Sequence, residues 1–249
     1  MKRWIPLSIA LAAALASTTT PTSAQGAASA TVERDAIAAL ERMGAYLRSL
    51  KSFQVKTETT TDDVLENGMK VTHSGVTDLL AQTPNRLRAE VSSDLQDRSY
   101  LYDGKTFTLY AKRVGYYASV PAPATLAELA DRLEDKYDLE IPLVDLFRWG
   151  GPKASTSQIT VATDVGPASV DGVTCEHYAF RQPGLDWQLW LQLGDYPLPR
   201  KLVLTTTSDE ARPQHTSTYN WNLAPSFDDG AFSFDPPPGA QKIVFAEKK

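Results

Sequence analysis

The stretch Leu185–Leu193 alternates strictly between two kinds of side chain, and this alternation constrains the fold more than any other feature of the chain. Leucine or tryptophan occupies each odd position, whereas Asp186, Gln188, Trp190 and Gln192 occupy the even positions. Successive side chains of a strand point to opposite faces of a sheet, so the pattern predicts a strand with one buried and one wetter face. On a helix, the same leucines would be spread around the whole cylinder.

A turn pair, Pro183-Gly184, precedes this strand and predicts a hairpin. Closing the hairpin at this pair opposes side chains that are chemically compatible, which supports the register. The predicted pairs are Arg181 with Asp186, Phe180 with Trp187, Tyr178 with Leu189, and His177 with Trp190. One further pair, Glu176 with Leu191, is awkward, and we place it at the rim of the sheet.

Other stretches also show strand patterns joined by tight turns. Asn67-Gly68 and Asp103-Gly104 are strong hairpin signals. Consecutive strands joined in this way form an antiparallel meander. The strands are expected near residues 53–60, 69–76, 86–92, 100–102, 105–112, 114–120, 159–165, 169–182, 185–193, 200–207 and 215–223.

Three segments have helical patterns. Residues 31–51 carry apolar side chains at three- and four-residue steps, which predicts an amphipathic helix that covers an apolar surface. Thr125-x-x-Glu128 is a capping box that begins a second helix. A third, short helix is expected from Pro142 to Trp149, and its apolar residues on nearly all sides indicate that it inserts into a concavity.

These elements predict a mainly β protein with some helix (α+β) and no domain linker. We expect a strongly curved antiparallel half-barrel of about eleven strands that holds the helices on its concave side. Residues 25–249 form a single domain in this interpretation.

The first residues have the features of an export signal. A basic start, Met1–Arg3, precedes a short apolar run, and Thr22-Ser-Ala24 fits a cleavage site. We therefore expect residues 1–24 to be a signal peptide that directs the protein to a periplasm and is cleaved after Ala24. No lipid anchor is expected, because no cysteine stands directly after the apolar run, where a lipoprotein would carry its attachment point.

Two further features bear on the compartment. No later stretch of the sequence is long and apolar enough to span a membrane. The only cysteine, Cys175, excludes an internal disulfide and is expected to be a small buried side chain.

The sequence offers little support for catalysis, cofactors, metals or nucleic acid. Removing residues 1–24 takes away two bases and no acid, so the net charge falls from −5 to −7, which disfavours nucleic acid. The three histidines, His73, His177 and His215, lie on separate strands without the spacing of a zinc motif. No hydrolase elbow and no glycine-rich nucleotide loop occurs.

Several phrases of the sequence together resemble a bacterial family of predicted periplasmic proteins of unknown function. The phrases are Tyr102–Tyr110, Tyr117–Pro123, Leu139–Leu146, Cys175–Pro183, Asp186–Trp190, Pro197–Arg200 and Phe232–Pro237. That family is similar to the lipoprotein-carrier fold of LolA, LolB and LppX, in which a half-open barrel and helices enclose an apolar cavity for acyl chains. The same fold forms a domain of RseB-type stress regulators. The resemblance implies the fold, and it implies lipid binding by analogy alone.

The positive functional signal is a set of apolar and aromatic side chains on the predicted strands and the short helix. We expect them to line a cavity and its lid, although a completely filled core fits the same pattern. The residues are Tyr102, Phe107, Leu109, Tyr117, Leu143, Leu146, Phe147, Trp187, Leu189, Leu191, Leu202 and Leu204. The leading hypothesis is a non-enzymatic periplasmic carrier for an apolar small molecule, lipid or acyl chain. The alternative is an envelope module that binds a protein partner or senses stress.

Overall fold

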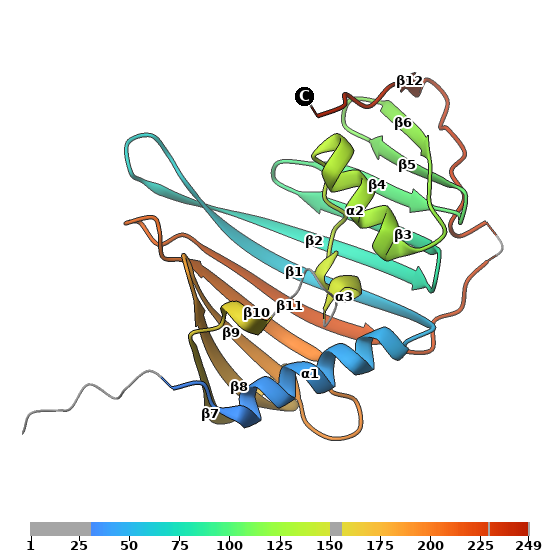
Figure 1. Cartoon of the computed structure of the whole chain (residues 1–249). Helices are drawn as coiled ribbons and strands as arrows, with labels where there is room; N and C mark the ends of the chain where they lie inside the picture. The colour runs from blue at the N-terminus through green and yellow to red at the C-terminus, as the bar shows by residue number, and fades with distance from the viewer. Residues whose placement is uncertain (1–30, 150–155, 229, 249) are drawn as a thin grey trace, which may run out of the picture.

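The computed structural model describes residues 31–149, 156–228 and 230–248 (Figure 1). The predicted signal peptide, residues 1–24, lies outside the described residues. The described part contains three α-helices and a short 3₁₀ helix beside one large sheet. The helices are α1 (Arg34–Ser49), α2 (Leu126–Tyr137), α3 (Asp145–Arg148) and η1 (Thr156–Gln158).

Twelve strands form a single sheet in the order β12-β6-β5-β4-β3-β2-β1-β11-β10-β9-β8-β7. Neighbouring strands run antiparallel, except that β12 pairs parallel with β6. The strands are β1 (Ser52–Val64), β2 (Lys70–Gln82), β3 (Arg86–Ser93), β4 (Asp97–Tyr102), β5 (Thr106–Ala111), β6 (Tyr116–Pro121), β7 (Val161–Val170), β8 (Val173–Gln182), β9 (Leu185–Gln192), β10 (Pro199–Thr206), β11 (Gln214–Asn222) and β12 (Gln241–Ile243). The prediction of a curved, unclosed antiparallel sheet is confirmed.

The hairpin around Pro183-Gly184 has the predicted register, with every expected pair opposed. Trp187 and Phe180 stack with ring centroids 4.0 Å apart on the inner face. His177 and Trp190 stack at the same distance on the outer face. The alternating pattern of β9 therefore separates a buried face from a wetter face, as the sequence predicts.

Two expectations about the strands need correction. Residues 169–182 do not form one strand, because the chain turns at Asp171-Gly172 between β7 and β8. Both turn residues have positive φ, which is the conformation that a tight two-residue hairpin turn requires. The second correction concerns β12, a three-residue strand near the C-terminus that the sequence pattern does not reveal.

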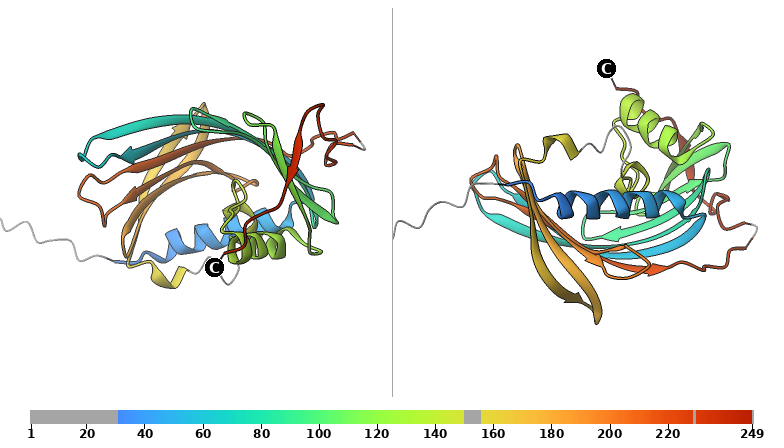
Figure 2. Two further views of the ribbon diagram at one scale, coloured as in Figure 1. Left: turned by 90° about the horizontal axis from the view of Figure 1, so that it is seen from above. Right: turned by 60° about the horizontal axis from the view of Figure 1, so that its bottom comes forward.

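The concave side of the sheet carries the helices. In Figure 2, α1 and α2 lie beneath the arch that the sheet forms. The apolar face of α1, which includes Leu40, Met43 and Leu47, is buried in the main core. The α2 helix begins at the predicted cap, where Thr125 Oγ1 accepts a hydrogen bond from the backbone N–H of Glu128 at 3.2 Å.

The third helix is much shorter than predicted. It contains the four residues Asp145–Arg148 rather than extending from Pro142 to Trp149. Leu143 has a φ of 57°, in the left-handed region, so a regular helix cannot continue through this position. The segment still enters the concavity, as its apolar composition predicts, because Ile141, Val144 and Leu146 are buried.

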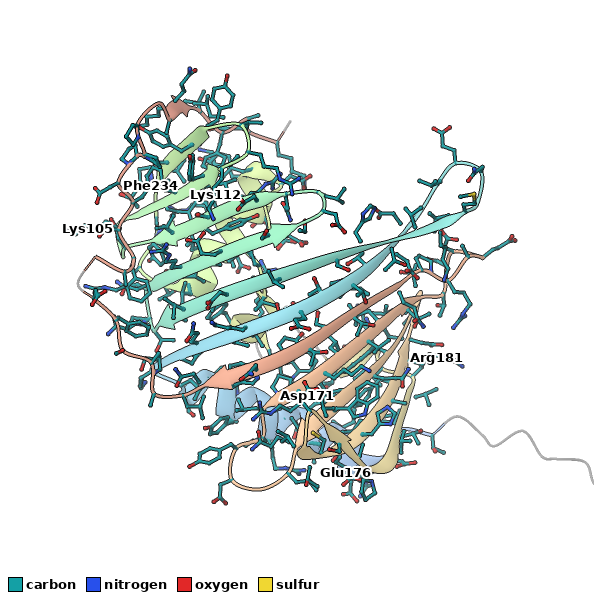
Figure 3. All side chains as sticks on the ribbon, turned by 180° about the vertical axis from the view of Figure 1, so that it is seen from behind. Lys105, Lys112, Asp171, Glu176, Arg181 and Phe234 are labelled. Carbon is teal, nitrogen blue, oxygen red and sulfur yellow. The ribbon has the colours of Figure 1, made fainter. Side chains whose placement is uncertain are left out.

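The convex side of the sheet is partly covered by the C-terminal segment. Figure 3 views the molecule from this side and shows Phe234 near β5 and β6. Its ring lies 5.0 Å from that of Tyr117 and 5.6 Å from that of Tyr110. The chain then returns to the concave side, where Phe245 contacts Phe107 and Tyr137.

We predict that the two tryptophans of β9 differ strongly in their contribution to stability. Trp187→Ala removes a buried ring that packs on Phe180 and should reduce the free energy of unfolding by about 3–5 kcal/mol. Trp190→Ala, on the opposite face of the same strand, should cost about 1 kcal/mol, the scale of one aromatic pair. Urea denaturation of both variants measures the difference, and equal losses would contradict the assignment of the faces.

Candidate ligand cavity

A cavity of about 980 Å³ lies between the concave face of the sheet and the helical elements. Its sheet wall comes from β1–β4 and β9–β11, and its other wall comes from α1, α2 and residues 138–149. Both apolar and polar side chains line the cavity. The apolar lining includes Met43, Leu47, Val91, Tyr100, Leu139, Ile141, Leu143, Leu146, Trp149, Leu189, Leu202 and Leu204. The polar lining includes Thr59, Thr61, Asp63, His73, Thr77, Arg98, Asp145, His215, Ser217 and Tyr219.

Polarity changes along the central strands of the concave face. On β1, the inward side chains begin with Phe53 and Val55, which are buried in the core. The following inward positions are Thr57, Thr59 and Thr61, in the order of the alternation. The helices therefore cover an apolar half of the concave face, whereas hydroxyl groups occupy its other half.

The polar half forms a hydrogen-bonded network across neighbouring strands. Thr61 Oγ1 lies 2.7 Å from His215 Nδ1, and His215 Nε2 lies 2.9 Å from Ser217 Oγ. On the other side of β1, Thr59 donates to the Gly75 carbonyl at 3.2 Å. These bonds fix the side chains in place, so the polar wall is preorganised.

Burial favours the uncharged form of two groups of this wall. It lowers the pKa of His215 from its ordinary value, because the surroundings disfavour the imidazolium. It raises the pKa of Tyr219 to about 12, so the phenol keeps its proton. Asp145 faces the cavity from α3, and loss of surrounding water raises the pKa of its carboxyl, an effect that Glu134 increases and Arg148 opposes.

Five of the twelve predicted site residues line this cavity. They are Leu143, Leu146, Leu189, Leu202 and Leu204. The two β10 residues lie opposite His215 and Ser217 of β11, so the leucines lie directly beside the polar wall.

The other seven predicted residues lie elsewhere. Most of them are part of the packed core or contact it, because the helices and Phe245 occupy the concave face above them. Tyr117 is different, since it lies on the convex face against Phe234. Tyr102 donates a hydrogen bond to the Pro123 carbonyl, and Phe147 packs on Phe53. Trp187 packs on Phe180 and Trp149. The other three, Phe107, Leu109 and Leu191, belong to the core or pack against it.

Sequence reasoning did not find the polar wall. Its members occur as alternate residues of threonine-rich strands, a pattern that solvent-facing positions also show. Two of the three histidines, His73 and His215, lie on it, one strand on either side of Thr61. That proximity joins positions far apart in the chain and becomes visible only in the folded sheet.

The segment that ends in Trp149 is fastened to both helices that flank it. The Trp149 indole donates to the Leu40 carbonyl of α1 at 3.1 Å. Arg148 bonds to Asp131 at 3.0 Å and to Glu134 at 2.6 Å, both on α2. Gly44 of α1 leaves room for the indole, since a Cβ there would lie 2.6 Å from Trp149 Cδ1.

A protein-family model described as "Predicted periplasmic protein (DUF2092)" matches residues 36–246. This match covers most of the chain and nearly all of the described structure. The chain belongs to the DUF2092 family. No curated protein sequence matches this family member.

Several solved structures resemble this DUF2092 protein at low sequence identity. An uncharacterized conserved protein from Thermus thermophilus is 11% identical, with a TM-score of 0.47, over 85% of this chain and 99% of that one. The lipoprotein LppX from Mycobacterium tuberculosis is 12% identical, with a TM-score of 0.47, over 78% and 98% of the two chains. LprF from Mycobacterium bovis is 16% identical, with a TM-score of 0.45, over 85% and 100%.

Further observations concern the part of the chain that the structure describes. Within it, no group of three or more His, Cys, Asp or Glu side chains is arranged to hold a metal ion. None of its helices has the length and apolar character needed to cross a membrane. Cys175 is fully buried and bears no disulfide.

We predict that Gly44→Ala destabilises the protein through Trp149. Alanine favours a helix interior by about 1 kcal/mol over glycine, but its Cβ would displace the indole from α1. The matched test is the same substitution in a Trp149→Leu background, where the 2.6 Å contact with the indole is absent and alanine should cost less stability than in the wild-type background. Urea denaturation of the four proteins gives the coupling, and a stabilising effect of alanine in both backgrounds would contradict this packing.

Proposed function

We propose that the protein is a non-enzymatic binding or carrier protein of the periplasm, and that its cavity shelters an apolar ligand such as a lipid or an acyl chain. The observation that carries the proposal is the cavity of about 980 Å³ beneath the arch of the sheet. This volume lies at the upper end of the range, roughly 300–1,000 Å³, that small-molecule sites occupy. Its leucine-lined part offers an apolar surface to a hydrocarbon chain.

Binding would draw its free energy from burial of methylene groups. Each methylene removed from water contributes roughly 0.8 kcal/mol, so a few of them against the leucine-lined part suffice for measurable affinity. We propose that Leu143, Leu146, Leu189, Leu202 and Leu204 contact the ligand. Met43 and Leu47 of α1 extend the same surface.

The segment from Ile141 to Trp149 would act as a lid in this proposal. It forms part of the cavity wall, and polar contacts of Arg148 and Trp149 join it to α2 and α1. Export is part of the same proposal, with cleavage after Ala24 and without a lipid anchor. The family's description as predicted periplasmic supports it.

A charge placed on the apolar part of the cavity should weaken binding of an apolar compound. We expect Leu204→Glu to reduce affinity for the neutral fluorescent probe N-phenyl-1-naphthylamine at least about tenfold, the effect of losing two methylene contacts. Leu193→Glu is the matched control, because Leu193 is 47% exposed and lies outside the cavity lining.

Probe titration is combined with circular dichroism to confirm that both variants fold. If Leu204→Glu fails to fold, Leu204→Trp narrows the cavity without adding a charge and should also weaken binding. A folded wild-type protein that does not bind the probe, or equal binding by both glutamate variants, would contradict the proposal.

A further inference from the structure

The polar half of the cavity wall indicates which kind of amphiphile the cavity would accept, an inference that rests on the proposed function. The wall consists of three rows, each made of directly opposed residues of the neighbouring strands β2, β1 and β11. The rows are Thr77–Thr57–Tyr219, Gly75–Thr59–Ser217 and His73–Thr61–His215. Apart from Thr57, which is buried between its two neighbours, the residues of these rows line the cavity next to the leucines of β10.

We propose that the cavity selects an amphiphile with an uncharged, hydroxyl- or ester-bearing head group, which binds to these three rows while the hydrocarbon chain lies on the leucines. Hydroxyl groups both donate and accept hydrogen bonds, so they match a neutral polar head. The chain from Thr61 through His215 to Ser217 holds such groups in fixed positions.

One hydroxyl of the rows has unused hydrogen-bonding capacity. Thr57 is 2% exposed, and its Oγ1 has no hydrogen-bond partner among the described residues. It lies between Thr77 and Tyr219, which both line the cavity. A buried hydroxyl without a partner is unfavourable, so a ligand oxygen that reaches this row would be bound preferentially.

The rows contain no permanent cation to hold an anionic head. Any charge on His73 is matched by Asp63, whose carboxylate lies 3.2 Å from it. His215 stays neutral because burial lowers its pKa. On the facing wall, the carboxyl of Asp145 acts electrostatically on Tyr219, so a carboxylate or phosphate placed here would meet a group of its own sign.

Two basic residues line the cavity outside the three rows. Lys248 is paired with Asp138 at 2.8 Å, next to the end of α2. Arg98 of β4 pairs with Val91, which in turn pairs with Thr77, so Arg98 lies in line with the first row, about 10 Å from Thr77 at the usual strand spacing. An anionic head bound at Arg98 would therefore lie beyond the β2 end of this row.

Three amphiphiles with the same chain length and different head charges test this inference. They are 1-monopalmitoylglycerol, palmitate and cetyltrimethylammonium, each titrated below its aggregation concentration to displace N-phenyl-1-naphthylamine from the protein without its signal peptide. We expect the neutral glyceride to displace the probe at a concentration at least about tenfold lower than either ion, the effect of one or two hydrogen bonds.

Thr61→Val should remove most of this preference, because valine keeps the shape of threonine and lacks its hydroxyl. Thr60→Val is the matched control on the same strand, since Thr60 points to the convex face. Thr60→Val should bind the probe as the wild-type protein does, and the probe affinity of Thr61→Val is measured first, so that displacement by each amphiphile is compared on the same basis. Ser217→Ala provides a second variant on β11 with the same expected effect.

Palmitate binding that equals or exceeds binding of the glyceride would overturn the inference. If palmitate then no longer binds to Arg98→Ala, its carboxylate contacts Arg98 on β4. Tighter binding of the cationic amphiphile would also overturn it and would indicate a carboxylate of the lining, such as Asp63 or Asp145, as the contact. In both cases the probe still binds, so the proposed carrier function stands. If neither the probe nor any amphiphile binds, both the inference and the proposed function fail.

Discussion

The structure depends on burial of only half of the concave face of one sheet. A sheet that does not close on itself leaves its concave face open to water unless other elements cover it. Here α1 buries Leu40, Met43 and Leu47 against that face, and the segment ending at Trp149 adds a second cover. The cover stops where the inward side chains change from apolar to hydroxyl-bearing, and the cavity begins at this boundary.

This boundary explains why the cavity persists in a folded protein. An apolar surface of this size facing water would be unfavourable, whereas threonine, serine and histidine side chains satisfy one another and tolerate water. The hydrogen bonds of His215 to Thr61 and Ser217 illustrate this arrangement. An amphiphile would complement both halves of the cavity, with its chain on the leucines of β10 and its head on the polar rows.

Local patterns in the sequence predict most of the fold, because turn chemistry and alternation act over short distances. Pro183-Gly184 and the alternation of β9 determine a register in which Phe180 stacks on Trp187. Asp171-Gly172 is an equally good turn signal, and the prediction of one strand over residues 169–182 was wrong because it passed over this pair. The predicted length of α3 was wrong because the left-handed conformation of Leu143 has no signature in its residue type.

The site was harder to predict because it depends on contacts between distant parts of the chain. Alternation divides the side chains of a strand into two faces but does not say which face is concave or what covers it. Tyr117 was assigned to the cavity, although Phe234, from the C-terminal segment, packs on it at the convex face. His215 and Thr61 meet only because β11 pairs with β1 across most of the chain.

The central claim is that the cavity holds an apolar or amphiphilic molecule, and native mass spectrometry of the exported protein tests it most directly. The protein would be purified from the periplasm without detergent, weighed intact, and then extracted with organic solvent. We predict a discrete additional mass that disappears on extraction and is recovered as a lipid-like compound. A bare polypeptide mass that also takes up none of the added amphiphiles would contradict the account and would direct attention to protein partners at the outer surface.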